Sequence, residues 1–278
     1  GFRCAGSMVI VGIDAVAKAR RTGEAVLART RAILKRLGMP DYARTAIELF
    51  GAETLYGPHA RTGQSREVMV RIVADHPMRE ALEIFAREIA PSGTSWSPGT
   101  TGPAAGRPSP SPLIKPFSFL LDKAEVPVSV LIGGREIAVE IPSGGAAPPG
   151  RAAVAPPAPY QRPDEAHVEV PLIRLAFARS GDKGNLANIG IVARRPDLLP
   201  LIWAEVTPDA VGRYFAHLAG GPVERFHLPG IAGINYVVHD ALAGGGPASP
   251  RMDPLGKGMG QMLLDLPVSV PRSLAATL

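Results

Sequence analysis

Residues 141–165 are the segment that most restricts how this chain folds. Seven prolines, six alanines and three glycines occupy 16 of these 25 positions, so the segment cannot supply an amphipathic helix or strand. This composition is typical of a semi-extended linker. A length of 278 residues is sufficient for two small domains. We therefore predict one domain over residues 1–140 and a second over residues 166–278, joined by the Pro/Ala/Gly-rich linker.

The N-terminal part alternates between strand and helix patterns. Its predicted strands are residues 2–11, 45–50, 66–74, 117–121, 126–132 and 136–141. Its predicted helices are residues 14–37, with Asp14 as N-cap and Gly38 at the end, and 78–89; a Ser/Thr/Gly/Pro-rich loop occupies 91–116. Gly133 and Gly134 indicate a hairpin between the last two strands. The order β-α-β-β-α-β predicts a split βαβ, ferredoxin-like sandwich with an added hairpin.

The C-terminal part also has strands and helices in an α+β order. Predicted strands cover residues 167–177, 189–193, 223–228 and 231–238, and predicted helices cover 196–205, 208–218 and 254–264. A polar glycine loop at 178–188 and a Gly-rich loop at 243–250 lie between them. The fold class we predict is therefore α+β, with two ferredoxin-like, split βαβ-type α/β sandwich domains joined by the linker.

The charge distribution and the composition exclude several classes of protein. The net charge is +5, and residues 1–40 alone, with eight Lys or Arg against two acidic residues, carry +6. This positive excess lies on one predicted helix. Its basic face is either exposed to solvent or a contact surface for an acidic partner, and we favour the solvent-exposed face. With 5% aromatic residues we expect no nucleic-acid partner. We expect no membrane span, because no apolar stretch reaches about 18 residues. The single cysteine, Cys4, is expected in a core. One cysteine forms no internal disulfide and no secretory leader pattern is seen, so we expect a cytoplasmic protein.

The loop at 178–188 is the most informative candidate site. Arg179 and Lys183 supply cationic donors, and its glycines allow backbone N–H groups to converge. Directional hydrogen bonds are expected from Ser180, Asn185 and Asn188, and a proton-transfer group from Asp182. Such a loop can hold a carboxylate, a phosphate or a thioester carbonyl; the alternative is a structural polar turn. A P-loop pattern is absent, and neighbouring glycines disfavour a helical Ser-x-x-Lys nucleophile at Ser180.

A second candidate site lies further along the chain. A glycine-rich loop at 243–250 runs toward a predicted helix, which is a favourable place for an anion, and Arg251 and Lys257 follow it. Asp253 is expected to cap that helix, with or without a ligand nearby. Asn235 and His239 end the preceding strand; His239 is a catalytic candidate, although a packing role is the simpler interpretation.

A third candidate region is the polar connection that contains His59 and Arg61, for which an exposed loop is the alternative. The six histidines are scattered and none has metal-ligand spacing, so we predict no metal site. No Gly-x-Gly-x-x-Gly follows a strand, and no cofactor is implied by any motif.

These motifs together resemble the acyclic terpene utilisation AtuA family. The resemblance lies in LAFARSGDKGN (175–185), ANIG (187–190), VERF (223–226), LPG (228–230), NYVVHDAL (235–242), the Gly-rich stretch to Lys257, QMLLD (261–265), and upstream GAE (51–53), YGPHA (56–60), SRE (65–67) and PGTTG (98–102). It implies a ferredoxin-fold C-terminal domain and a link to the breakdown of acyclic terpenoids such as citronellol and geraniol. It also implies that the chain is the C-terminal portion of a longer protein.

From the residues and the resemblance we expect an enzyme that acts on a branched acyl-CoA or organic acid by hydration or lyase-type chemistry. Asp182, Lys183 and His239 are its catalytic candidates, and a CoA moiety would belong to the substrate. The alternative is a non-catalytic assembly or substrate-presenting subunit. As partners we expect a second copy of the chain or the missing N-terminal half.

Overall fold

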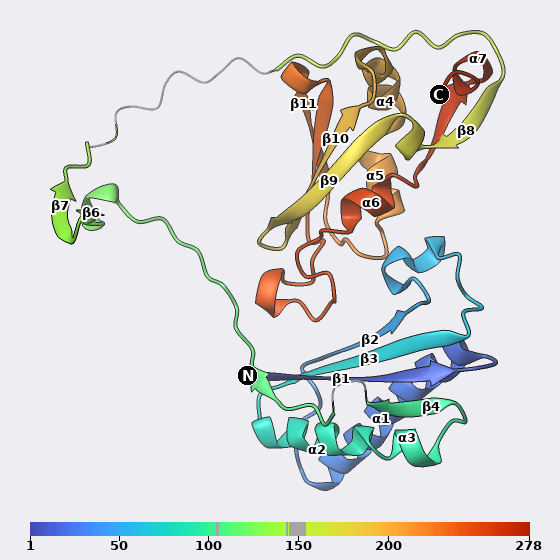
Figure 1. The fold of residues 1–278 in the computed structure, drawn as a ribbon, viewed down its shortest axis with the longest axis vertical. Helices are drawn as coiled ribbons and strands as arrows, with labels where there is room; N and C mark the ends of the chain where they lie inside the picture. The colour runs from blue at the N-terminus through green and yellow to red at the C-terminus, as the bar shows by residue number, and fades with distance from the viewer. Residues whose placement is uncertain (104–105, 143, 145–153) are drawn as a thin grey trace. The chain divides into compact units, whose positions relative to one another are not determined.

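The computed structural model describes residues 1–103, 106–142, 144 and 154–278; residues 143 and 145–153 of the predicted linker lie outside this range. The chain forms two compact units. The first combines Gly1–Lys115 with Pro157–Leu278, and the second is Pro116–Pro156. The first unit contains two larger antiparallel sheets and a two-stranded one, and helices cover one face of each of the larger sheets (Figure 1).

The N-terminal sheet has the predicted split βαβ arrangement. Its elements in chain order are β1 (Phe2–Val11), α1 (Ala15–Arg36), β2 (Arg44–Phe50), η1 (Thr54–His59), β3 (Glu67–His76), α2 (Arg79–Ile89), α3 (Ser92–Ser95) and β4 (Thr100–Pro103). The spatial order is β2-β3-β1-β4, and all neighbours are antiparallel. The short strand β5 (Ser111–Pro112) also pairs with β1. The ferredoxin-like prediction for this part is therefore confirmed.

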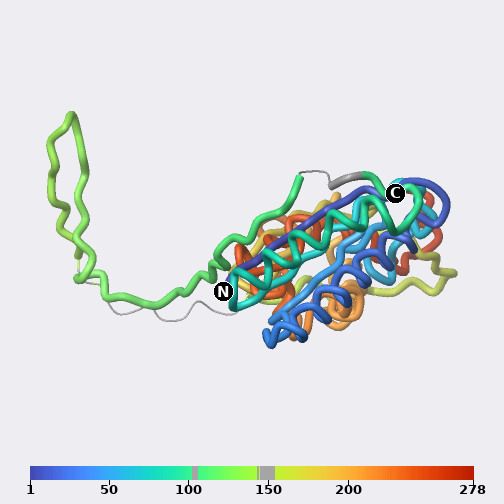
Figure 2. The backbone as a smooth tube through the Cα atoms, turned by 90° about the horizontal axis from the view of Figure 1, so that it is seen from below, coloured from blue at the N-terminus to red at the C-terminus, as the bar shows by residue number. Residues whose placement is uncertain are grey.

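Helices α1 and α2 lie side by side on one face of this sheet (Figure 2). Alternate residues of β1 face them, and Cys4, Met8 and Ile10 are almost fully buried. Burial raises the pKa of the Cys4 thiol to about 12, so this cysteine is a packing residue, as predicted. Asp14 does occupy the N-cap position of α1, but its backbone is left-handed and its side chain makes no capping hydrogen bond.

The C-terminal sheet repeats this spatial order. Its elements are β9 (Ala176–Lys183), β10 (Leu186–Ala193), α4 (Leu199–Glu205), α5 (Pro208–Tyr214), β11 (Val223–Leu228), β12 (Gly233–Val238) and α6 (Met259–Leu263). The strands are antiparallel in the order β11-β12-β10-β9. Strand β9, which precedes β10 in the chain, therefore takes the edge position that β4 has in the N-terminal sheet. Ile189, Ile191, Ile234 and Tyr236 form the core beneath the helices.

Several predicted elements were wrong. Residues 178–188 are not a loop, because they belong to strands β9 and β10 and to the two-residue turn between them. The predicted strand at 167–177 is interrupted by η3 (Leu172–Arg174), which separates β9 from β8 (His167–Pro171). Strand β8 instead pairs with β13 (Pro267–Pro271), which leads to α7 (Arg272–Ala275). The predicted helix at 254–264 shortens to α6, since glycines at 256, 258 and 260 disfavour a longer helix.

The loop predicted at 91–116 contains α3, β4 and β5, and its strands complete the N-terminal sheet. Residues 117–121 form no strand. The predicted hairpin exists as β6 (Val128–Ile132) and β7 (Arg135–Val139), with Gly133 and Gly134 both at positive φ. It forms a sheet of its own within the second unit. One face of this hairpin is apolar except for Arg135 and is partly exposed to solvent. Its apolar residues are Val128, Val130, Ile132, Ile137 and Val139.

Candidate functional site

The face of the C-terminal sheet that the helices do not cover is the candidate site, and we call it the open face. Side chains alternate along a strand, so Ala187, Ile189 and Ile191 face the helices, while Asn188 and Gly190 face the other way. The same alternation decides which residues of the other strands reach the open face. They are Phe177, Arg179, Gly181 and Lys183 on β9; Leu186, Asn188, Gly190 and Val192 on β10; Asn235, Val237 and, just beyond β12, His239; and Glu224, Phe226 and Leu228 on β11.

The register aligns these residues in rows across the sheet. One row runs Arg179, Gly190, Asn235, Phe226, and no side chain occupies its second position. The next row begins with Gly181 and Asn188. Gly190 on β10 and Gly181 on the edge strand β9 carry no side chains, so no side chain covers the backbone at these two positions of the open face. Polar side chains lie around them.

A third cation reaches the open face from outside the sheet. A Cβ atom on Gly181 would lie 3.0 Å from the Lys257 ammonium nitrogen, so Lys257 extends around the edge strand to this point. Arg179 and Lys183 project from the same strand face, one on either side of Gly181. A larger residue at position 181 would require this ammonium group to shift.

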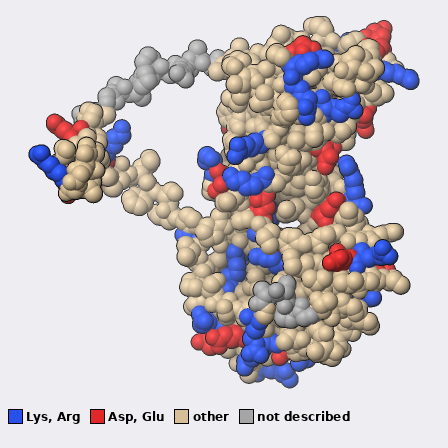
Figure 3. All heavy atoms as spheres, in the orientation of Figure 1, with Lys and Arg blue, Asp and Glu red and all other residues tan. Residues whose placement is uncertain are grey.

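These cations have no acidic partners in the described part of the chain. Arg179, Lys183 and Lys257 are exposed, and none of them forms an ion pair there. The Lys183 ammonium donates to the carbonyl oxygen of Asp182 at 2.9 Å, which leaves two of its three hydrogens available. In the space-filling view, Lys and Arg side chains lie over the β9–β10 hairpin with acidic side chains beside them (Figure 3). The arrangement favours an anion.

His239 lies on the other side of the open face, beyond the end of β12. Its Nε2 lies 2.6 Å from Oε1 of Glu224, a carboxylate on β11. When Nε2 carries the proton and donates to Glu224, Nδ1 is the acceptor nitrogen and can take a proton. His239 and Lys183 lie two strands apart, which is roughly 10 Å at the usual strand spacing.

Two predicted site residues lie on the opposite face of β9. The buried Ser180 hydroxyl donates to the carbonyl of Gly256 at 2.6 Å and accepts from the N–H of Gly260 at 2.7 Å. Ser180 therefore attaches the edge strand to the start of α6. Asp182 lies on the same side as Ser180, since it alternates with Gly181 and Lys183. It therefore lies on the opposite face of β9 from Arg179 and Lys183.

Asn185 forms the turn of the β9–β10 hairpin and holds a neighbouring loop. Its side-chain amide donates to Asp240 at 2.7 Å, and its side-chain oxygen accepts from the N–H of Gly244 at 2.7 Å. Both polar atoms of the side chain are thus used within the protein. The turn is close to Gly245, where a Cβ atom would overlap the carbonyl of Gly184.

Arg251 and Asp253 also make internal contacts. The Arg251 guanidinium donates to the carbonyl oxygens of Ala241 at 2.6 Å and Leu218 at 2.9 Å. Burial lowers the pKa of Arg251, although the charges of Glu48 and Asp240 oppose this. The Asp253 carboxylate accepts from the N–H groups of Lys257 and Gly258, both at 2.8 Å. Asp253 therefore caps the turn that precedes α6 rather than the predicted longer helix.

His59 and Arg61 lie in a different place, at a cavity of about 150 Å³ with Tyr56, Tyr214 and Asp265. The His59 ring stacks on Tyr214 with centroids 4.2 Å apart, and its Nε2 lies 3.0 Å from the Tyr214 carbonyl. The Arg61 guanidinium is 3.8 Å from Asp265, and the Arg61 N–H donates to Glu53. Two carboxylates surround this arginine, so the cavity does not favour an anion.

The helix-free face of the N-terminal sheet carries a cluster of charges that the sequence did not reveal. Asp75 on β3 is buried between Arg3 on β1 and Arg44 on β2, at 2.7 and 3.1 Å. Burial tends to raise the pKa of Asp75, but the two guanidinium groups outweigh it and hold the pKa below its usual range. Arg71 and Glu48 form a second pair at 2.5 Å on the same face.

This cluster binds residues 243–252 of the C-terminal part, which we call the docking loop. Arg3, Arg44 and Arg71 donate to its backbone carbonyls, and Glu48 accepts from the N–H of Met252 at 2.8 Å. The carbonyls that accept belong to Ala243, Pro247, Ala248, Ser249 and Pro250. The glycine-rich segment that we predicted as a flexible anion loop is therefore part of an internal interface. Charged residues at alternate strand positions were the available signal.

Two family models match the chain. The model of the acyclic terpene utilisation family protein AtuA matches residues 1–132, and that of the AtuA ferredoxin-like domain matches residues 170–269. The chain belongs to the AtuA family. The ferredoxin-like model covers the sheet that carries the open face, and the family description associates the chain with terpenoid catabolism. The comparisons with curated proteins and with solved structures returned no match.

Among the described residues, no group of three or more His, Cys, Asp or Glu side chains is arranged to hold a metal ion. None of the helices in the described part of the chain combines the length and the apolar character needed to cross a bilayer.

Proposed function

We propose that the open face of this AtuA-family chain binds the anionic or carbonyl end of a branched terpenoid acid or its CoA thioester. The observation that carries the proposal is the group of three unpaired cations, Arg179, Lys183 and Lys257, around the space above Gly181. A carboxylate or a thioester oxygen takes charge-assisted hydrogen bonds from such donors. Asn188 and Asn235 add neutral donors on the same face.

The reaction we propose is hydration or lyase-type addition–elimination at an activated acyl group. Negative charge then develops on the carbonyl oxygen, and fixed cationic and amide donors stabilise it. His239, oriented by Glu224, is the group that exchanges a proton with the substrate carbon through Nδ1. Asp182 is left out of this step because strand alternation places it on the opposite face of β9.

A thermal-shift screen of the whole chain tests the proposal. The ligands are CoA thioesters, free terpenoid acids and small polycarboxylates, and the variant is Lys183→Ala. A ligand at 100 times its Kd stabilises the folded protein by about 2.7 kcal/mol. We expect an acid or thioester to raise the melting temperature, and this shift to shrink in the variant. A shift that is identical in Lys183→Ala would refute the assignment.

A non-catalytic role as an assembly or substrate-presenting subunit is the second candidate function. The apolar face of the β6–β7 hairpin favours it, because an isolated two-stranded sheet is marginally stable in water and gains from a partner. A second copy of the chain is the partner we propose. This candidate predicts that Val130→Asp changes the molar mass measured by light scattering, while ligand shifts at the open face persist.

A further inference from the structure

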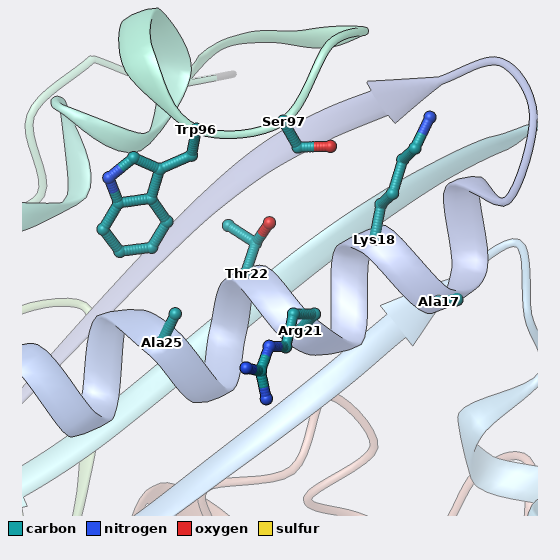
Figure 4. Close-up of a pocket in the computed structure, with 7 residues that line it drawn as sticks. All are labelled: Ala17, Lys18, Arg21, Thr22, Ala25, Trp96 and Ser97. Atoms are coloured by element: carbon teal, nitrogen blue, oxygen red, sulfur yellow. The ribbon is translucent and has the colours of Figure 1, made fainter.

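A groove on the N-terminal domain lies outside every site described so far. It has a volume of about 430 Å³ and is formed by α1 and the residues that follow α3 (Figure 4). Its lining residues are Ala17, Lys18, Arg21, Thr22, Ala25, Trp96 and Ser97. The volume is within the usual range of small-molecule sites.

The floor of the groove is one face of α1. Lys18, Arg21, Thr22 and Ala25 follow a spacing of three or four residues, which places them on the same side of the helix. Between the two cations and Trp96 this floor carries only small side chains. The hollow therefore results from the sequence of α1, and the indole of Trp96 forms the wall opposite (Figure 4).

The charged residues that line the groove are both cations. Lys18 extends from α1 on the side of Ser97, and Arg21 extends from the rim away from Trp96 (Figure 4). Neither cation forms an ion pair with a described residue, although Arg29 and Arg31 of the same helix pair with Glu88 and Asp41. The seven lining residues include no acidic side chain.

We infer that this groove binds a carboxylate with an apolar body. The carboxylate is held by Lys18, and the apolar body lies against the Trp96 ring, Thr22 and Ala25. An apolar wall with a few well-placed polar groups is the usual construction of a small-molecule site, and guanidinium and ammonium groups are natural carboxylate partners. The inference goes beyond the proposed function: it needs none of the open-face residues, and it gives the basic face of α1 a ligand instead of solvent.

Fluorescence of Trp96 in the full chain tests the inference directly. The chain has two tryptophans, so the background variant is Trp203→Phe, which leaves Trp96 as the single indole emitter. The probes are octanoate, the neutral 1-octanol and adenosine monophosphate. We expect saturable emission changes with octanoate. We expect the Kd to rise about tenfold in Lys18→Gln, as loss of a charged hydrogen bond implies.

The matched control is Arg20→Gln, which removes the same charge from an exposed neighbour on α1 that does not line the groove. We expect octanoate binding to be unchanged in this variant. The inference is overturned if octanoate gives no saturable change, if 1-octanol binds equally well, if Arg20→Gln weakens binding as much as Lys18→Gln, or if the nucleotide binds more tightly. The variants leave Arg179, Lys183 and Lys257 intact, so failure here is distinct from failure of the proposed function.

Discussion

The two sheets of the larger unit share one strand order but use their helix-free faces differently. On the N-terminal sheet, arginines alternate with carboxylates, and the pairs bind the docking loop. On the C-terminal sheet, Arg179 and Lys183 stand on the edge strand without carboxylates beside them, and two positions that could carry side chains are glycine. Charges that are paired within the protein form an interface, and charges left unpaired remain available to a ligand. The following predictions test that contrast.

Removal of the buried carboxylate should disrupt the N-terminal face most. In Asp75→Asn, two guanidinium groups lose the charge between them, and such a loss in a buried pair costs about 3–5 kcal/mol. Chemical denaturation of the variant measures this change in the free energy of unfolding. Asp164→Asn, at an exposed carboxylate in the C-terminal part, serves as the control and should change stability by less than about 0.5 kcal/mol. Equal effects in both variants would contradict the contrast.

The same carboxylate predicts a pH dependence of stability. The pKa of Asp75 is lower in the folded protein than in the unfolded chain, so the stabilisation is complete above the unfolded pKa of about 4. It is lost as the pH falls through the folded pKa. Denaturation midpoints measured from pH 6 downward should therefore begin to decrease once the pH is lower than about 4. In Asp75→Asn this decrease should be smaller. Parallel curves for the two proteins would exclude Asp75 as the group responsible.

On the C-terminal sheet, Ser180→Ala should cost about 1–3 kcal/mol, because it leaves the N–H of Gly260 without its acceptor in a buried place. Thermal unfolding measures the loss. Ser65→Ala, where the hydroxyl contacts the carbonyl of Glu67 near the surface, should have little effect. If Ser180→Ala were neutral, the edge strand would not depend on this attachment to α6.

The smallest expected change in stability is at Gly190→Val. A Cβ atom at Gly190 would approach only the carbonyl of Arg179, at 3.8 Å, and valine favours strands, so stability should change by about 1 kcal/mol or less. The isopropyl group would nevertheless occupy the position between Arg179 and Asn235 that has no side chain on the open face. We expect the folded variant to lose ligand binding in calorimetric titration. Unimpaired binding would place the ligand elsewhere.

The sequence predicted those elements whose pattern is local. The alternation of apolar residues located β1 and β11, and apolar residues spaced three and four positions apart located the long helix α1. The two glycines located the β6–β7 turn. Strand β4 was missed because its Thr, Gly and Pro residues have no strand pattern. Its position depends on pairing with β1 and on the N–H of Val11, which donates to the carbonyl oxygen of Gly99.

The candidate site was predicted in part, and the errors have a common cause. Treating residues 178–188 as a loop allowed every polar side chain to converge, whereas a strand sends alternate residues to opposite faces. Arg179, Lys183, Asn188, Asn235 and His239 therefore share one face, and Ser180 and Asp182 do not. The role of the docking loop follows from contacts between residues about 200 positions apart, such as Arg44 with Ala243, which local patterns do not encode. The Arg251 side chain contacts the carbonyls of Leu218 and Ala241, which no motif indicates.

The most direct test of the contrast between the two sheets is an amide chemical-shift map of the chain during titration with a terpenoid carboxylate. We predict that the amides of Arg179, Gly181 and Gly190 on the open face shift in a saturable way, and that the amides of Arg3, Arg44 and Arg71 under the docking loop do not. Saturable shifts at the N-terminal charge cluster with none on the open face would contradict the account.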